Sequence, residues 1–173
     1  MCKNKLKNNF SEGDTSTYRL QKNFYITMNT KKITIKGSGG HGVKLLMSIL
    51  AKLLADTKKL TLVFDYDSAV RGGFINGNLI ISDEKIASPI IDKADIIADM
   101  IEANVEIKGK KQEINIEEIK KDAENFVLNM FYLGLVMNLI EVELNSEKIK
   151  EILGKKYSEA NMQSIELGYQ YKI

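Results

Sequence analysis

The stretch ITIKGSGGHGVKLLMSILAKLL, residues 33–54, decides the fold class. It opens with a short β-branched run that ends at Gly37, and a glycine-rich segment follows. From Val43 onward the residues are apolar except for one narrow polar stripe, which favours a helix. A helix this apolar is buried on most sides, either by its own sheet or by a partner. The stretch therefore predicts a strand, a tight turn and a buried helix.

The residues that follow predict more strands. Residues 60–64 form a continuous apolar run, typical of a parallel strand covered on both faces. Residues 78–81 and 94–98 are further strand candidates. The strand–turn–helix–strand order predicts an α/β fold, a Rossmann-like three-layer sandwich with a mostly parallel sheet. We expect one central or edge element of this sheet to be shortened.

The second half of the chain combines a hairpin with helices. Residues 105–107 and 113–116 are predicted to pair, and residues 124–140 to form a strongly apolar helix. That apolar stretch is shorter than a membrane span requires, so no membrane association is expected. Two further helices are predicted, one capped by Asn145 or Ser146 and one capped by Ser158.

The first 28 residues differ from the rest. They are polar and contain no apolar run of the kind found in a signal peptide. Met28 offers a second start just before the first strand. We interpret residues 1–28 as a disordered extension and residues 29–173 as a single domain.

The composition excludes several kinds of chemistry. The 173 residues include one Cys, one His and two Arg, and the net charge is +2. So few ligands exclude a structural zinc site and a cysteine-ligated iron–sulfur cluster, and no internal disulfide can form. The weak charge does not predict binding to nucleic acid or an anionic membrane. These features fit a cytoplasmic protein without a metal site or catalytic residues of its own.

The glycine-rich segment is the first candidate site. Gly37, Gly39 and Gly42 satisfy the G-x-G-x-x-G pattern between a strand and a helix, with Gly40 and His41 inside it. Backbone N–H groups in such a turn bind anions, and the helix N-terminus adds a favourable dipole. The pattern fits a phosphate-binding loop, but a purely structural turn would also favour glycine. We expect the backbone of His41 to matter more than its ring.

A second glycine cluster, Arg71-Gly72-Gly73, is predicted to follow a strand, at the edge where open α/β sheets bind ligands. The guanidinium of Arg71 suits a phosphate or a carboxylate, although a surface ion pair is the alternative. Asp65, at the end of a predicted strand, lies where a dinucleotide-binding fold places its ribose-binding acid.

Four motifs in order resemble a known family. They are GSGGHGV at residues 37–43, RGG at 71–73, SPI followed by AD within 88–95, and Asn129 followed by Leu133-Gly134. This set is similar to the gamma subunit, or gamma domain, of the 2-oxoacid:ferredoxin oxidoreductases that act on pyruvate, 2-oxoglutarate, ketoisovalerate or indolepyruvate. His41 stands where the family has Gln, and the segment 95–124 is shorter than usual.

The resemblance implies a function shared among several chains. Alpha and beta subunits would hold thiamine diphosphate, and iron–sulfur clusters would lie on partner chains, including a ferredoxin-like delta subunit. The gamma portion would pack against the thiamine-binding subunits and handle coenzyme A, with Gly39, Gly40, Gly42 and Arg71 near its phosphates. The isolated chain would be inactive. A free-standing nucleotide-binding protein of the NAD type and a non-catalytic assembly subunit remain alternatives.

Overall fold

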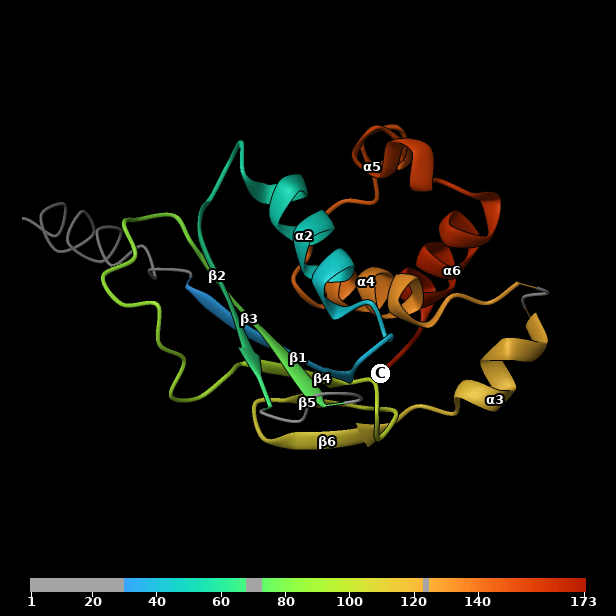
Figure 1. Cartoon of the computed structure of the whole chain (residues 1–173), viewed down its shortest axis with the longest axis horizontal. Coiled ribbons are helices and arrows are strands. Elements are labelled where there is room, and N and C mark those ends of the chain that lie inside the picture. Colours follow the sequence, from blue (N-terminus) through green and yellow to red (C-terminus); the bar gives the residue numbers. More distant parts are fainter. Residues whose placement is uncertain (1–29, 68–72, 123–124) are drawn as a thin grey trace, which may run out of the picture.

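The computed structural model describes residues 30–67, 73–122 and 125–173, so the predicted extension 1–28 lies outside it. The described strands are β1 (Lys31–Ser38), β2 (Lys59–Tyr66), β3 (Phe74–Ser82), β4 (Ile96–Asp99), β5 (Asn104–Ile107) and β6 (Lys110–Glu113). The helices are α2 (Val43–Leu54), α3 (Ile116–Ile119), α4 (Leu128–Leu139), α5 (Ser146–Leu153) and α6 (Glu159–Gln170), with 3-10 turns at Lys120–Asp122 and Gly154–Lys156. Figure 1 shows these elements as one sheet with helices beside it.

The strands form a single sheet in the order β2-β3-β1-β4-β5-β6. Only the β1–β4 pair is parallel, and the other four pairs are antiparallel. The prediction of a mostly parallel sheet is therefore wrong, and a Rossmann-like arrangement is not confirmed. The fold is a mixed α/β fold.

The error has a physical cause in β2. Its apolar run suggested a strand buried on both faces, but β2 lies at the edge of the sheet and forms a hairpin with β3. A connection as short as residues 67–73 joins antiparallel strands, because parallel neighbours need a crossover of about a dozen residues. Leu60, Leu62 and Phe64 pack against the core, whereas Val63 on the other face is 36% exposed.

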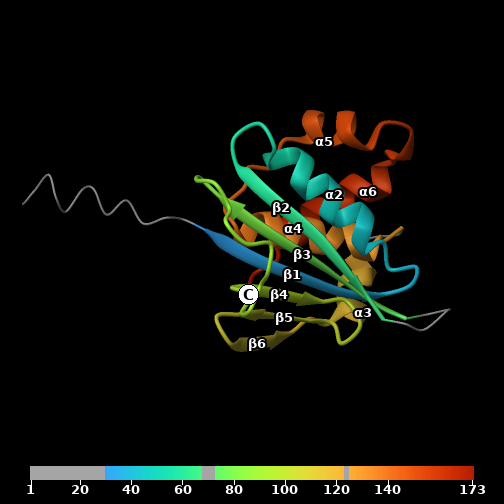
Figure 2. The same ribbon diagram turned by 60° about the vertical axis from the view of Figure 1, so that its left-hand side comes forward.

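Helices cover one face of the sheet. Figures 1 and 2 show α2, α4, α5 and α6 on the same side, which makes a sheet and one helical layer instead of the predicted three layers. Helix α4 is buried along its length from Met130 to Met137. The strongly apolar helix is thus covered within the chain, by α2, by α6 and by the sheet.

The second half follows the sequence prediction with one shift. The hairpin exists, but its second strand is Lys110–Glu113, three residues earlier than expected. Lys108 (φ 49°) and Gly109 (φ 84°) form the two-residue turn, as hairpin turns with positive φ require. The short β5 and β6 lie at one side of the sheet.

Two predicted helix caps are confirmed. The Asn145 side chain accepts a hydrogen bond from the N–H of Lys148, and the Ser158 side chain accepts one from the N–H of Asn161. Each side chain satisfies one of the N–H groups that the first helical turn leaves without a partner.

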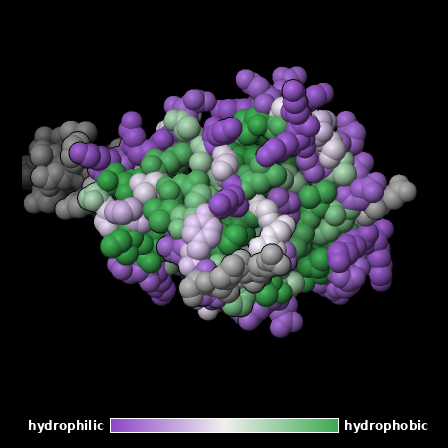
Figure 3. Space-filling model, viewed as in Figure 1, coloured by the Kyte–Doolittle hydropathy of each residue, from purple (hydrophilic) through white to green (hydrophobic). Residues whose placement is uncertain are grey.

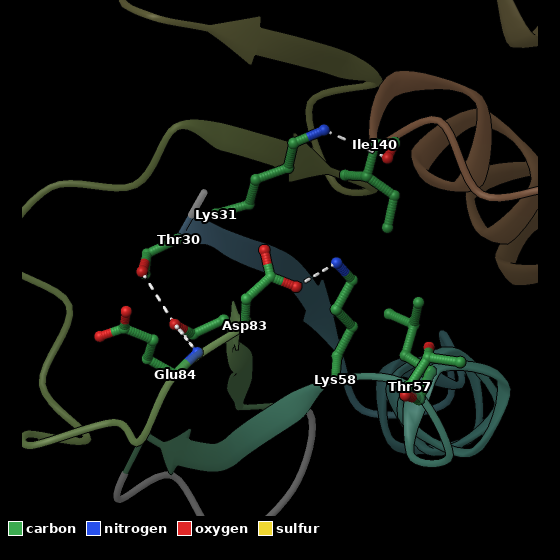
Figure 4. A network of polar contacts seen from close by, with 9 residues as sticks. Thr30, Lys31, Thr57, Lys58, Asp83, Glu84 and Ile140 are labelled. Carbon is green, nitrogen blue, oxygen red and sulfur yellow. Dashed lines mark hydrogen bonds and ion pairs between the residues drawn. The ribbon is translucent and has the colours of Figure 1, made fainter. Parts of the chain in front are cut away.

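Polar contacts tie the strand ends together away from the glycine loops (Figure 4). Lys58, just before β2, forms an ion pair with Asp83, just after β3. The hydroxyls of Thr30 and Ser82 are 3.1 Å apart, and Ser82 accepts a hydrogen bond from the N–H of Glu84.

Among the described residues, no helix is long and apolar enough to cross a membrane.

Candidate functional site

The first glycine loop joins the carboxyl end of β1 to the start of α2. Gly40 (φ 98°) and Gly42 (φ 74°) have left-handed backbone conformations that strongly favour glycine. The Gly42 carbonyl accepts the first helical hydrogen bond, from Leu46 N–H at 3.0 Å. No side chain caps α2 and no acidic residue lies in its first turn. The first N–H groups of α2 therefore form an uncapped, electropositive helix end.

His41 stabilises this turn from within. Its backbone N–H donates to Ser38 O at 3.1 Å, and its ring Nδ1 accepts from Ser38 N–H at 3.4 Å. Both groups are thus engaged inside the loop, and the ring is half-buried. The His41 backbone and ring therefore both hold the turn closed against Ser38.

The fold brings the two predicted glycine clusters together. The N–H of Gly39 donates to the carbonyl of Gly73 at 3.2 Å. Close to this contact, Asp67 N–H donates to Phe74 O at 3.0 Å and closes the β2–β3 hairpin. Arg71 and Gly72 lie outside the described residues, within the connection that this contact closes. Two segments more than thirty residues apart in sequence therefore meet at one end of the sheet.

Gly37 belongs to the packing beneath the loop. A Cβ at this position would lie 2.5 Å from Val43 Cγ2 and 3.1 Å from Met100 Cε. Glycine thus permits the first turn of α2 to lie close to β1. Of the predicted site residues, Gly37 is buried beneath the loop, whereas Gly40 is exposed on the loop's surface.

Asp65 does not join the glycine loops. It lies within β2, on the face opposite α2, and accepts a hydrogen bond from Asn78 Nδ2 at 2.6 Å. Asn78 in turn accepts from the Thr34 hydroxyl at 2.8 Å. Asp65 belongs to a polar row across the uncovered face of the sheet. The dinucleotide interpretation needs an acid beside the loop, and Asp65 is placed elsewhere.

Two residues near the loop were not predicted as site residues. Asn129, at the start of α4, directs Nδ2 to the Gly42 carbonyl at 3.5 Å. Lys44, in the first turn of α2, places its ammonium 4.9 Å from the centroid of the Tyr66 ring. The N-x-x-x-L-G pattern marked Asn129, but its contact with the loop depends on tertiary structure. Lys44 was visible only as part of a polar stripe.

A cavity of about 500 Å³ opens beside Lys44, between α2 and the end of α5. Lys44, Lys52 and Lys156 supply three of its lining side chains, with Leu45 and Ile152 as apolar walls. Its volume lies within the range of small-molecule sites. This lysine-lined groove therefore adjoins the electropositive N-terminal end of α2.

These features define an α/β domain with two glycine loops joined at one end of its sheet. Residues 32–107 match the family model described as pyruvate ferredoxin/flavodoxin oxidoreductase. The matched region contains both glycine clusters and three of the four motifs on which the resemblance depends. None of the curated proteins matches the chain.

Solved structures show the same fold. A keto/oxoacid ferredoxin oxidoreductase gamma subunit from Geobacter sulfurreducens has a TM-score of 0.55 and 20% identity, over 82% of this chain and 95% of that one. The pyruvate oxidoreductase subunit PORC from Thermotoga maritima has a TM-score of 0.61 and 17% identity, over 82% and 96%.

A third similar structure comes from a longer chain. It is a 2-oxoglutarate:ferredoxin oxidoreductase from Magnetococcus marinus with 2-oxoglutarate, coenzyme A and succinyl-CoA bound. The TM-score is 0.63 and the identity 17%, over 81% of the present chain. The chain spans 30% of that protein's length.

Proposed function

We propose that the chain is a gamma-type subunit of a 2-oxoacid:ferredoxin oxidoreductase. Such an enzyme decarboxylates a 2-oxoacid, transfers the acyl group to coenzyme A and reduces ferredoxin. The observation that carries the proposal is the family match over residues 32–107, which includes both glycine loops. Support comes from the fold shared with a gamma subunit and with PORC, each matched over nearly its whole length.

The site would bind phosphate groups of coenzyme A through backbone N–H groups. Gly39 N–H is already bonded to Gly73, which leaves Gly40, Gly42 and the first turn of α2 as the donors facing a ligand. Lys44 adds a cation to that turn, and no acidic residue there opposes an anion. These features fit an anionic group at the loop.

The remaining site residues would shape or complete this loop. Gly37, His41, Gly72 and Gly73 would hold the backbone, and Arg71 would orient a coenzyme A phosphate or fix the loop at a subunit junction. Thiamine diphosphate and iron–sulfur clusters would lie on partner subunits of the alpha, beta and delta kind. This chain would then supply the acyl acceptor's binding surface, and decarboxylation and electron transfer would occur elsewhere.

The test is reconstitution with candidate thiamine-binding and ferredoxin-like subunits. We expect 2-oxoacid-dependent, coenzyme A-dependent reduction of a ferredoxin substitute that requires this chain. Arg71→Ala and Gly40→Ala should each raise the KM for coenzyme A several-fold, with the KM for the 2-oxoacid unchanged. Equal activity of the partners without the chain would overturn the proposal.

Gly109→Ala is the matched control for Gly40→Ala. Both glycines have positive φ, and a Cβ at either position would meet no atom within 4 Å. The two substitutions therefore introduce similar backbone strain, but only Gly40 lies at the proposed site.

Calorimetric titration with coenzyme A, NAD and NADP should show the tightest binding for coenzyme A, and preferential binding of NAD would contradict the assignment.

A further inference from the structure

The two edges of the sheet differ in how they face solvent. β6, at one edge, has four exposed residues, two of them lysines. Short edge strands that carry lysine resist pairing with other strands. β2, at the other edge, has eight residues without proline or glycine, and among the described residues it pairs with β3 alone. Its outer backbone groups are a template for another strand.

The surface around β2 is apolar for an edge. Val63 and Tyr66 are exposed, and Leu60, Leu62 and Phe64 are only partly buried. In the space-filling view, hydrophobic side chains reach the surface where Figure 1 places β2 and β3. A long apolar edge of this kind is stabilised when a further strand covers it.

We propose that β2 pairs antiparallel with β2 of a second copy of this chain, across a twofold axis at Leu62. In that register Lys59 faces Asp65 of the second copy, and Leu60 faces its Phe64. Thr61 faces its Val63. An antiparallel pair places directly opposite residues on the same face of the sheet, and every pair in this register obeys that rule.

The charges favour this occupant over an unrelated strand. Each end of the paired strands carries one Lys59–Asp65 pair, so the twofold axis creates two opposite-charge contacts from one sequence. Lys59 is exposed and forms no ion pair with any described residue, whereas its neighbour Lys58 is already paired with Asp83 (Figure 4). Asp65 is exposed and accepts one hydrogen bond from Asn78. Opposite charges directly across a strand pair are stabilising.

The same register also keeps the apolar residues of both copies on one face of the joined sheet and the more polar residues on the other face. Leu60, Leu62 and Phe64 lie on the face that α2 covers, and they would meet the same residues of the second copy. The uncovered face would receive only Lys59, Thr61, Val63 and Asp65. The helical layers of both copies would lie on one side of a continuous sheet.

A charge swap tests the register. The full chain is expected to sediment as a dimer that dissociates on dilution. Lys59→Asp creates two Asp–Asp contacts and Asp65→Lys creates two Lys–Lys contacts, so each should raise the dissociation constant about tenfold or more. The double variant restores opposite charges at both contacts and should recover the dimer. Circular dichroism checks that each variant is folded.

Lys110→Asp is the matched control, because it makes the same charge change on the exposed β6 edge. It should leave the dissociation constant unchanged. A chain that stays monomeric at all concentrations overturns the proposal, and so does a dimer that survives both single reversals. Capture of a partner subunit through β2 by a monomeric chain would also overturn it. None of these outcomes depends on coenzyme A, so this test fails or succeeds separately from the proposed function.

Discussion

Glycine serves two different purposes at two points along helix α4. At its start, Asn129 reaches the loop in which Gly40 and Gly42 adopt positive φ angles. In its middle, Gly134 packs against α6, where a Cβ on Gly134 would lie 1.9 Å from the Ile165 carbonyl oxygen. In the same way, a Cβ on Gly168 of α6 would lie 1.9 Å from the Phe131 carbonyl oxygen of α4.

The difference between the two regions lies in what a side chain would meet. A Cβ at Gly40 meets no atom within 4 Å, so glycine is needed there for its backbone conformation. Gly134 and Gly168 have ordinary helical backbones, and there glycine is needed because the neighbouring backbone is so close. A change at Gly40 should therefore impair binding, and a changed contact between α4 and α6 should impair folding.

The largest expected effect comes from Gly134→Ala. The new methyl group would collide with the backbone of α6, which cannot move away as the end of a flexible side chain can. We expect the free energy of unfolding to fall by about 3 kcal/mol, the upper part of the range for overpacking. Urea denaturation followed by circular dichroism measures it.

Gln163→Ala provides the control on the same helix. Gln163 is exposed on α6, so its replacement should change the free energy of unfolding by no more than about 0.5 kcal/mol. Wild-type stability in Gly134→Ala would show that α4 and α6 do not cross at the described separation.

A smaller effect is expected from Gly42→Ala in the loop. The new Cβ would lie 2.3 Å from Asn129 Nδ2, and the φ of 74° would strain any residue other than glycine. We expect a loss of about 2 kcal/mol in the free energy of unfolding. In an Asn129→Ala background the collision disappears and only the strain remains, so the loss should be about 1 kcal/mol.

The double-mutant cycle separates the two causes, because each variant's unfolding is measured with and without Asn129. A loss that is the same in both backgrounds would mean that Asn129 does not touch the loop. The cycle thus sharpens the comparison: collision with a side chain at Gly42 can be relieved by one substitution, whereas collision with backbone at Gly134 cannot.

The sequence predicted local structure well where the pattern was local. The turn before α2, the hairpin near Lys108 and the caps at Asn145 and Ser158 all depend on neighbouring residues. Strand direction depends on which strands become neighbours, and the apolar run of β2 carries no information about that. The sheet was therefore predicted as mostly parallel and is mostly antiparallel.

The candidate site also combines local features that the sequence predicts with tertiary contacts that it does not predict. The glycine clusters were recognised from residue type and spacing, but their contact through Gly39 and Gly73 depends on the β2–β3 hairpin. Asp65 was expected beside the loop because a parallel strand would end there. In the observed sheet its side chain faces away from α2. Lys44 lies near the site because α2 packs close to Tyr66, and the sequence pattern does not predict that contact.

The smallest expected effect concerns the contact that joins α4 to the sheet. The buried Tyr132 hydroxyl donates to the Asp99 carbonyl at 3.1 Å. Tyr132→Phe removes this hydrogen bond with little change in shape, so we expect a loss of about 1 kcal/mol in the free energy of unfolding at neutral pH. Tyr66→Phe removes an exposed hydroxyl and should leave stability unchanged.

The pH dependence distinguishes this hydrogen bond from simple packing. Burial, helped by the negative charge of Asp99, raises the pKa of the Tyr132 phenol above its ordinary value of 10.0. Above about pH 10 the unfolded chain therefore loses this proton while the folded chain keeps it, which destabilises the wild type. Tyr132→Phe lacks that proton, so its deficit relative to the wild type should shrink as the pH rises above 10. A deficit that stays constant through this range would show that the hydroxyl is open to solvent.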